Sequence, residues 1–272
     1  MHSREEKLEA FGRLTDVLHE LREKCPWDRK QTFDSLRPNT IEEVYELCDA
    51  SMAKDWKNVC KELGDVLEHV VFYAIMASEM GEFDIADVCN KEAEKLIFRH
   101  PHIYPAATGA GMPEVKTAQD VLNSWEQIKL KEKDGNKTVL SGVPQSLPSL
   151  IKAYRIQDKA RNVGFDWEKR EDVWDKVYEE LDELRSELEK GDKEHSTDEM
   201  GDFIFSVVNA ARLYKINPDT ALERTNRKFI RRFNHVEHQA ALRHKNLRDM
   251  TLAEMDELWN EAKAMEKDQL TQ

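Results

Sequence analysis

Two stretches of sequence that each occur twice, in the same order, constrain most strongly how this chain can fold. IEEVYELCD, which begins at Ile41, aligns with YEELDELRS, which begins at Tyr178. At the same offset, KELGDVL from Lys61 aligns with DEMGDFI from Asp198. Repetition at a fixed interval is the signature of a chain built from copies of one supersecondary unit. The sequence therefore predicts a tandem duplication.

A further pair of blocks extends the repeat, because KLIFRHPHI from Lys95 aligns with KFIRRFNHV from Lys228. Apolar residues recur at intervals of three and four, as in Val173, Val177 and Leu181, and strand-like alternation is nearly absent. Glycine (10 residues) and proline (8 residues) are scarce, which disfavours a turn-rich β fold. We predict an all-α protein made of two tandem helical-bundle units.

The boundary between the units is expected where glycine and proline interrupt the helical periodicity. A length of 272 residues allows one large or two small domains, at about 150 residues per domain. The run from Asp134 to Pro148 has the composition of an interdomain linker. We predict an N-terminal unit at 1–134, a linker at 135–148 and a C-terminal unit at 149–272. Further helix breaks are expected at 25–28, 37–39, 81, 164, 191 and 217–218.

Eight acidic residues recur in the repeated blocks as Glu-x-x-Glu, fifteen residues, then Glu-x-Gly-Asp. They are Glu43, Glu46, Glu62 and Asp65 in the first unit, and Glu180, Glu183, Glu199 and Asp202 in the second. Residues three apart share a helix face, and fifteen residues suffice for a turn between two antiparallel helices. Four carboxylates brought together in this way repel one another unless they hold cations. Because no His or Cys accompanies them, the pattern predicts a Mg²⁺ site, with Mn²⁺ as the alternative ion.

A purely structural role is the alternative for each acidic pair taken alone. Glu43 can close a capping box with Thr40, and Glu199 can do the same with Ser196. Recurrence of both pairs with the same gap favours the metal site. The glycine inside each Glu-x-Gly-Asp favours it too, since glycine in a helix interior costs about 1 kcal/mol relative to alanine.

Short motifs accompany the carboxylates. They are CPWD at 25–28, RHPH at 99–102, SLPSL at 146–150 and NVGFDW at 162–167. With both carboxylate sets, they make the chain similar over nearly its whole length to the MazG family of nucleoside triphosphate pyrophosphohydrolases. The resemblance implies an all-α bundle, a homodimer, Mg²⁺ dependence, and hydrolysis of NTPs or dNTPs to the monophosphate and pyrophosphate. It also implies tandem copies of unequal competence.

That chemistry assigns roles to residues of the second unit. The carboxylates Glu180, Glu183, Glu199 and Asp202 would hold metal that activates a water, and one of them can act as general base. Lys228 and Arg232, one turn apart on a helix, can hold phosphate oxygens, as can Lys176. The other candidates for substrate binding are Glu179, His195, Arg231 and Trp259, whose indole can stack on a base. The alternatives are a solvated basic helix surface and an interior aromatic.

Two differences between the repeats favour the second unit as the working site. The first unit has Asn39 where the second has Lys176, and Pro101 where the second has Asn234. Proline at this position should break a helix just after Arg99. Both sets of carboxylates are intact. We expect the N-terminal unit to serve mainly in oligomerisation or regulation.

Charge and composition disfavour several other functions. A net charge of -13 opposes general binding to DNA or RNA. The absence of a long apolar run and the charged N-terminus MHSREEKLEA predict neither a membrane span nor a signal peptide, and hence a cytoplasmic protein. The four cysteines have no Cys-x-x-Cys spacing and are expected to be reduced. The sequence contains neither a Walker loop nor a Gly-x-Ser-x-Gly elbow.

Two other functions stay open on the sequence alone. One is a narrower all-α phosphohydrolase, similar to dimeric dUTPase or phosphoribosyl-ATP pyrophosphohydrolase. The other is a non-catalytic helical regulatory protein that binds nucleotides or a partner through its apolar helix faces. The preferred base and the attacked phosphorus are not fixed by the sequence.

Overall fold

The computed structural model describes residues 1–105, 117, 121, 128 and 138–270, and within these every regular element is a helix. The all-α prediction is therefore confirmed. The chain divides into two compact units, Met1–Ala118 and Gln119–Gln272. Part of the predicted linker, residues 135–137, lies outside the described residues, and the linker bounds stay a prediction. No helix of the described part is both long and apolar enough to cross a membrane.

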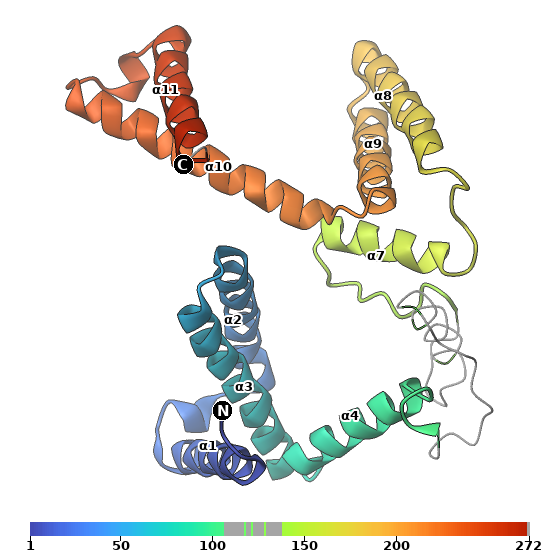
Figure 1. Ribbon diagram of the computed structural model, residues 1–272, viewed down its shortest axis with the longest axis vertical. Coiled ribbons are helices and arrows are strands. Elements are labelled where there is room, and N and C mark those ends of the chain that lie inside the picture. Colours follow the sequence, from blue (N-terminus) through green and yellow to red (C-terminus); the bar gives the residue numbers. More distant parts are fainter. Residues whose placement is uncertain (106–116, 118–120, 122–127, 129–137, 271–272) are drawn as a thin grey trace. The chain divides into compact units, whose positions relative to one another are not determined.

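The described part of the first unit contains four long helices, with a short 3-10 turn between the first two (Figure 1). They are α1 (Arg4–Lys24), η1 (Asp28–Lys30), α2 (Phe33–Ala53), α3 (Trp56–Glu79) and α4 (Ile85–Arg99). Helices α2 and α3 form a close antiparallel hairpin. Lys54, with a left-handed φ of 56°, ends α2, and the Asp55 side chain caps α3 through the Asn58 amide.

The core of the first unit lies where α1, α2 and α3 meet. Leu18 of α1, Leu36 of α2 and Phe72 of α3 are each at most 4% exposed and pack in one cluster. Burying such side chains contributes about 1.5–3 kcal/mol each, so this cluster fixes the position of the α2–α3 hairpin.

Helix α2 runs through Pro38, so the break expected at 37–39 is wrong. Two features hold the first turns of α2 in place around the proline. Thr32 and Ser35 close a capping box at its start, and Leu36 is buried in the core. These interactions offset the hydrogen bond that proline cannot donate.

The second unit contains five described helices and two short 3-10 turns (Figure 1). They are α7 (Ser149–Arg161), η2 (Arg170–Asp172), α8 (Val173–Lys190), α9 (Lys193–Leu213), α10 (Pro218–Leu242), η3 (Leu247–Asp249) and α11 (Leu252–Leu270). Helices α8 and α9 form a hairpin like that of α2 and α3. Gly191 ends α8 with a φ of 75°, which favours glycine, and Asp192 caps α9.

Two separate apolar clusters stabilise the second unit. Val173 and Val177 of α8 pack against Ala210 of α9. Val236 of α10 and Leu258 of α11 belong to the other cluster, at the α10–α11 contact. The first cluster fixes α8 against α9 and so holds the residues that the two helices present to each other.

The structure confirms the duplication predicted from the sequence. Each copy of the carboxylate pattern lies on one helical hairpin, α2–α3 or α8–α9. The predicted effect of Pro101 is confirmed as well, since α4 ends at Arg99 whereas α10 continues beyond Asn234 to Leu242.

Candidate functional site

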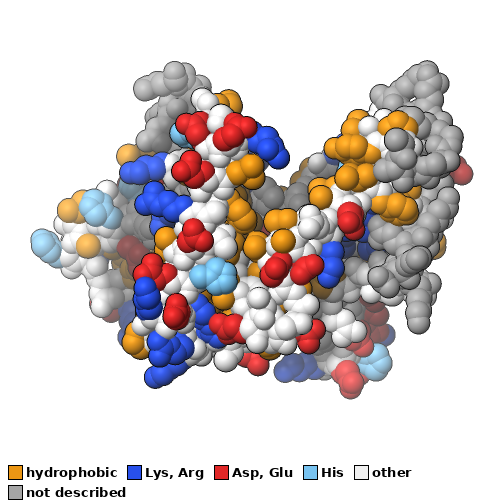
Figure 2. Space-filling model, turned by 90° about the horizontal axis from the view of Figure 1, so that it is seen from below, with side chains coloured by type: hydrophobic (Ala, Val, Ile, Leu, Met, Phe, Trp, Pro, Cys, Tyr) orange, Lys and Arg blue, Asp and Glu red, His pale blue; other side chains and the backbone are white. Residues whose placement is uncertain are grey.

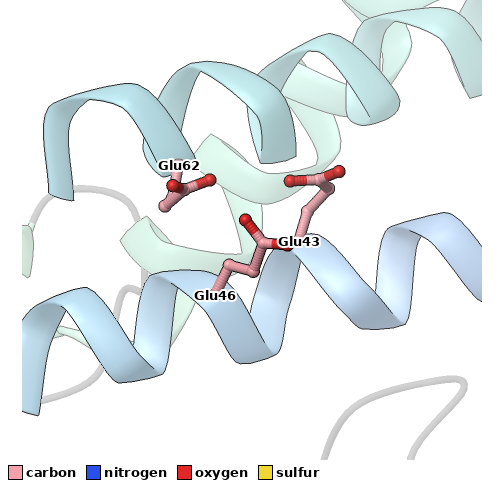
Figure 3. A group of neighbouring side chains, drawn as sticks. All are labelled: Glu43, Glu46 and Glu62. Carbon is pink, nitrogen blue, oxygen red and sulfur yellow. The ribbon is translucent and has the colours of Figure 1, made fainter. Parts of the chain in front are cut away.

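The α2–α3 hairpin brings three carboxylates of the first unit together. Glu43 and Glu46 project from α2, and Glu62 projects from α3 into the space between the helices (Figure 3). One oxygen from each lies within 4.8 Å of the others, a spacing that suits a shared metal ion. Asp65, the fourth predicted ligand, lies outside this group and accepts a hydrogen bond from Lys61.

Lys61 places a positive charge inside the first cluster. Its Nζ donates hydrogen bonds to both carboxylate oxygens of Glu62, at 3.0 and 3.1 Å, and to Oδ2 of Asp65 at 3.1 Å. The hydrogen bonds with Glu62 and then Asp65 raise the pKa of Lys61, so its ammonium stays charged. Two of the four predicted ligands of this unit are thus already paired with a side-chain cation.

The α8–α9 hairpin builds the second cluster in the same way. Glu180 of α8 lies with Glu199 and Asp202 of α9, one oxygen of each within 4.8 Å of the others. Glu180 is 7% exposed, while Asp202 is open to solvent. Glu183, the fourth predicted ligand, is exposed and lies outside the group.

Mutual repulsion and burial act on both clusters. Burial is the largest cause that raises the pKa of Glu199, followed by the charges of Glu183 and Asp202. In the first unit, burial and then the charge of Asp65 raise the pKa of Glu43. A cation bound at either cluster would neutralise the carboxylates and so remove the repulsion between them. The donor set in both hairpins is oxygen alone, which fits Mg²⁺ or Mn²⁺.

The side-chain cation of the second cluster is Lys176. Whereas Lys61 lies on α3, the counterpart of α9, Lys176 lies on α8. Its Nζ lies 2.7 Å from Oε1 of Glu180 and 2.9 Å from Oε1 of Glu179. Hydrogen bonding to Glu180 is the largest cause that raises the pKa of Lys176. At the position equivalent to Lys61, α9 carries Asp198. The α9 side of the second cluster therefore bears an additional acid where the first unit has an ammonium.

The structure excludes the capping alternative for Glu43 and Glu199. Helix α2 begins at Phe33 under a Thr32 cap, and α9 begins at Lys193 under an Asp192 cap. Both glutamates therefore lie inside their helices. Their sequence partners, Thr40 and Ser196, are not helix caps.

The glycines of both Glu-x-Gly-Asp motifs border open space. A Cβ added to Gly64 or to Gly201 would meet no atom within 4 Å. Packing within the chain therefore does not require glycine at either position. The absence of a side chain leaves room directly beside the carboxylates, on a surface where a ligand can approach the helix.

A cavity of about 390 Å³ in the second unit opens beside the carboxylates. Lys176, Glu180 and Asp202 form its charged end. The remaining lining residues are mainly apolar, with a few polar groups: Leu140, Ile156, Gln157, Ala160, Phe165, Trp167, Val173, Phe205, Ser206, Asn209 and Arg212. An apolar cavity with a few polar groups and a charged end is typical of a small-molecule site.

A buried arginine ties one wall of the cavity to α9. The side chain of Arg212 is 5% exposed and binds both carboxylate oxygens of Asp166. It also donates two hydrogen bonds to Oδ1 of Asn209. Asp166 belongs to the NVGFDW segment, whose Phe165 and Trp167 line the cavity. The sequence prediction included NVGFDW as a motif but assigned no site role to Arg212, Asn209 or Gln157.

The other predicted substrate-binding residues lie in two further places. His195 is exposed at the start of α9, where its Nδ1 is 2.7 Å from Asp192, and this hydrogen bond raises the pKa of His195. Arg231 and Arg232 of α10 both pair with Glu266 of α11.

The Arg232 guanidinium also lies 5.6 Å from the ring centroid of Trp259. Lys228 is half-buried one turn earlier on α10. No contact between this α10–α11 group and the carboxylates occurs among those described for the second unit. Its phosphate and base contacts stay a prediction.

Comparison with known proteins agrees with the geometry. Residues 31–104 and 169–237 match the family model described as the MazG nucleotide pyrophosphohydrolase domain. The chain is 40% identical to the nucleoside triphosphate pyrophosphohydrolase of Escherichia coli K12, over 96% of this chain and 100% of that protein.

Two further relatives show the same likeness. The nucleoside triphosphate pyrophosphohydrolase/pyrophosphatase MazG of Thermotoga maritima is 40% identical, over 93% of this chain and 95% of its own length. The protein YabN of Bacillus subtilis is 44% identical over 97% of this chain, which corresponds to 54% of YabN. Each copy of the family model covers one of the two carboxylate hairpins.

Proposed function

This chain belongs to the MazG nucleotide pyrophosphohydrolase family, and on that premise we propose that it hydrolyses nucleoside triphosphates, NTPs or dNTPs, to the monophosphate and pyrophosphate. One observation carries the assignment to a site. In the second unit a carboxylate cluster stands at the charged end of a cavity of about 390 Å³. The cluster suits a metal-bound triphosphate, and the apolar part of the cavity suits a base.

Glu180, Glu199 and Asp202 would hold Mg²⁺ or Mn²⁺, and Glu183, one turn further along α8, is the fourth candidate ligand. A divalent cation bound there supplies charge neutralisation for the triphosphate and activation of a water nucleophile. The fit rests on the donor set, which consists of carboxylate oxygens from facing helices.

The other side chains position the substrate. Lys176 is held at the cluster by Glu180, and its ammonium could bind a phosphate oxygen of the substrate there. Arg212 holds the wall that carries Phe165 and Trp167 through Asp166. The predicted roles of Lys228, Arg231, Arg232, His195, Glu179 and Trp259 in substrate binding belong to the same proposal.

The second unit is the working site in this proposal. Lys61 binds two of the four predicted ligands of the first unit, Glu62 and Asp65. In the second unit Lys176 binds only one of the four, Glu180, and the position equivalent to Lys61 is acidic, at Asp198. A side-chain ammonium that is already bonded lowers the gain from binding a cation. The first unit then serves mainly in oligomerisation or regulation.

We further propose a cytoplasmic homodimer that does not bind nucleic acid. Large apolar side chains are exposed in the hairpin helices, among them Tyr178, Ile204 and Phe205. Obligate dimers cover such surface with a second copy. Figure 2 shows acidic and basic side chains interspersed over the face in view, with no wide basic surface of the kind that binds a nucleic-acid backbone.

The test is product analysis with the purified full chain. Each common NTP and dNTP is incubated with and without Mg²⁺, and the products are separated by chromatography. We expect monophosphate and pyrophosphate only when metal is present. Activity confined to one base would indicate a narrower, dUTPase-like enzyme, and diphosphate with orthophosphate would show cleavage of a different bond. Metal-dependent nucleotide binding without turnover would indicate a regulatory protein instead.

A further inference from the structure

Gln157 carries a buried hydrogen-bond acceptor that nothing in the described chain uses. It lies on α7, lines the cavity and is 6% exposed. Its Nε2 donates a hydrogen bond of 2.8 Å to the backbone carbonyl of Phe205 on α9. Its Oε1 is buried without a hydrogen-bond partner among the described residues.

The contact with Phe205 fixes which way the amide faces. A carbonyl oxygen only accepts, so the amide nitrogen of Gln157 must be the atom that faces it. The remaining polar atom, Oε1, is therefore a hydrogen-bond acceptor, and the hydrogen bond from Nε2 to Phe205 fixes its position. A buried polar atom without a partner costs folding free energy, and native proteins rarely keep one without a role.

Two other polar side chains that line the cavity each have a hydrogen-bond partner within the chain. Ser206 donates its hydroxyl to the Phe203 carbonyl. Asn209 uses Oδ1 for Arg212, which in turn binds Asp166. Gln157 thus adds a buried acceptor without a partner among the described residues to a cavity whose walls include Ile156 and Phe165. A ligand that fits these walls has an apolar surface and an N–H donor at its edge.

We propose that Gln157 is a specificity-determining residue, whose Oε1 accepts a hydrogen bond from an N–H group on the edge of the substrate's base. The inference rests on the proposed function, because it takes the triphosphate to lie at Glu180 and Asp202, which border the same cavity. Nucleobases combine a flat ring with an edge N–H, whereas an inorganic polyphosphate has neither. The acceptor therefore distinguishes a nucleotide from other polyphosphates.

The test compares the wild-type protein with Gln157→Leu, which removes the acceptor without a large change in volume. The substrates are the nucleotide that the wild type uses best and its analogue without the edge N–H. That analogue is the 6-deamino form for adenosine, the 4-deamino form for cytidine and the N3-methyl form for uridine. We expect the wild type to prefer the natural base by about tenfold to a hundredfold in kcat/KM. In Gln157→Leu the preference should fall to about one.

Two controls separate this contact from a general defect. Gln157→Glu, studied at pH 5 where a buried carboxyl takes up a proton, keeps an acceptor oxygen and should keep the preference. All three proteins should bind the complex of Mg²⁺ and tripolyphosphate with the same Kd, measured by calorimetry. An unchanged base preference in Gln157→Leu would overturn the proposal, and so would an equal loss of tripolyphosphate binding.

Failure of the proposed function would be recognised separately, since the wild type would then release no monophosphate from any nucleotide. Calorimetry still tests Gln157 in that case. The wild type should bind the natural nucleotide more tightly than the analogue, and Gln157→Leu should bind both alike. Equal binding of the two ligands by the wild type would reject the contact.

Discussion

Lys61 donates hydrogen bonds to both carboxylate oxygens of Glu62, at 3.0 and 3.1 Å, inside the acidic cluster of the first unit. The duplicated hairpin has Asp198 at the position of Lys61. Two copies of one helical unit therefore offer a metal ion different surroundings, although their four predicted ligands correspond one to one.

A change of charge at Asp198 or at Lys61 should change the metal affinity of the unit that contains the residue. Asp198→Lys places an ammonium beside Glu199, so we expect Mg²⁺ affinity of the second unit to fall about tenfold or more, with a parallel loss of hydrolysis. Lys61→Ala should strengthen binding in the first unit without raising hydrolysis. Calorimetric titration with Mg²⁺ gives the affinity and the number of sites per chain. Equal affinities in Asp198→Lys and the wild type would contradict this view of Lys61.

Removal of one ligand should identify the catalytic unit. Glu180→Ala deletes the buried member of the second cluster, and we expect more than a hundredfold loss of hydrolysis with helicity and oligomeric state unchanged. The matched control is Glu43→Ala, its repeat equivalent, which should keep hydrolysis within about twofold. Circular dichroism and light scattering check the fold. Loss of activity in Glu43→Ala alone would place the working site in the first unit.

Alanine at Gly201 should separate stability from activity. The position is inside α9 and borders open space, so Gly201→Ala should stabilise the protein by about 0.5–1 kcal/mol. The added methyl group enters the space beside Asp202, and we expect hydrolysis to fall at least tenfold. Gly12→Ala, in the interior of α1 and also facing open space, is the control. It should stabilise the protein without loss of activity, as thermal melts and initial rates can establish.

Loss of Asp166 should loosen one wall of the cavity. Asp166→Ala leaves the buried Arg212 guanidinium without its carboxylate partner, so we expect the protein to lose about 2–4 kcal/mol of stability. Because Phe165 and Trp167 adjoin Asp166, KM for the nucleotide should rise more than kcat falls. Urea denaturation and steady-state kinetics give both quantities. Glu168 is exposed and directly follows this segment, so Glu168→Ala should change neither quantity. A matching KM increase in Glu168→Ala would argue against a role of the Asp166–Arg212 pair in positioning the wall.

Most of the helical architecture could be predicted from local pattern. Apolar spacing and the scarcity of glycine and proline predicted an all-α chain. Pro101, which stands where the second repeat has Asn234, correctly predicted where α4 ends. The break expected near Pro38 was wrong. A proline residue indicates only a local preference, whereas the Thr32 cap and the buried Leu36 come from the surrounding structure.

The candidate site could be predicted in part. Spacing along the helices predicted that the carboxylates would converge, and three of four do so in each unit. It did not predict that Glu183 would lie outside its group or that Lys61 would enter the other cluster. These outcomes depend on how two helices are rotated and shifted against each other, which the packing of apolar side chains between them decides.

The sequence by itself determined the duplication, because two blocks recur at one offset along the chain. It also determined the helical class and the facing carboxylates, because these follow from periodicity within one helix or one hairpin. Only the tertiary structure decided the cavity, the Arg212–Asp166 pair and the unused oxygen of Gln157. Gln157 meets Phe205, and Arg212 meets Asp166, across more than forty residues of chain. Contacts of that range are set by the close packing of whole helices, which no local pattern records.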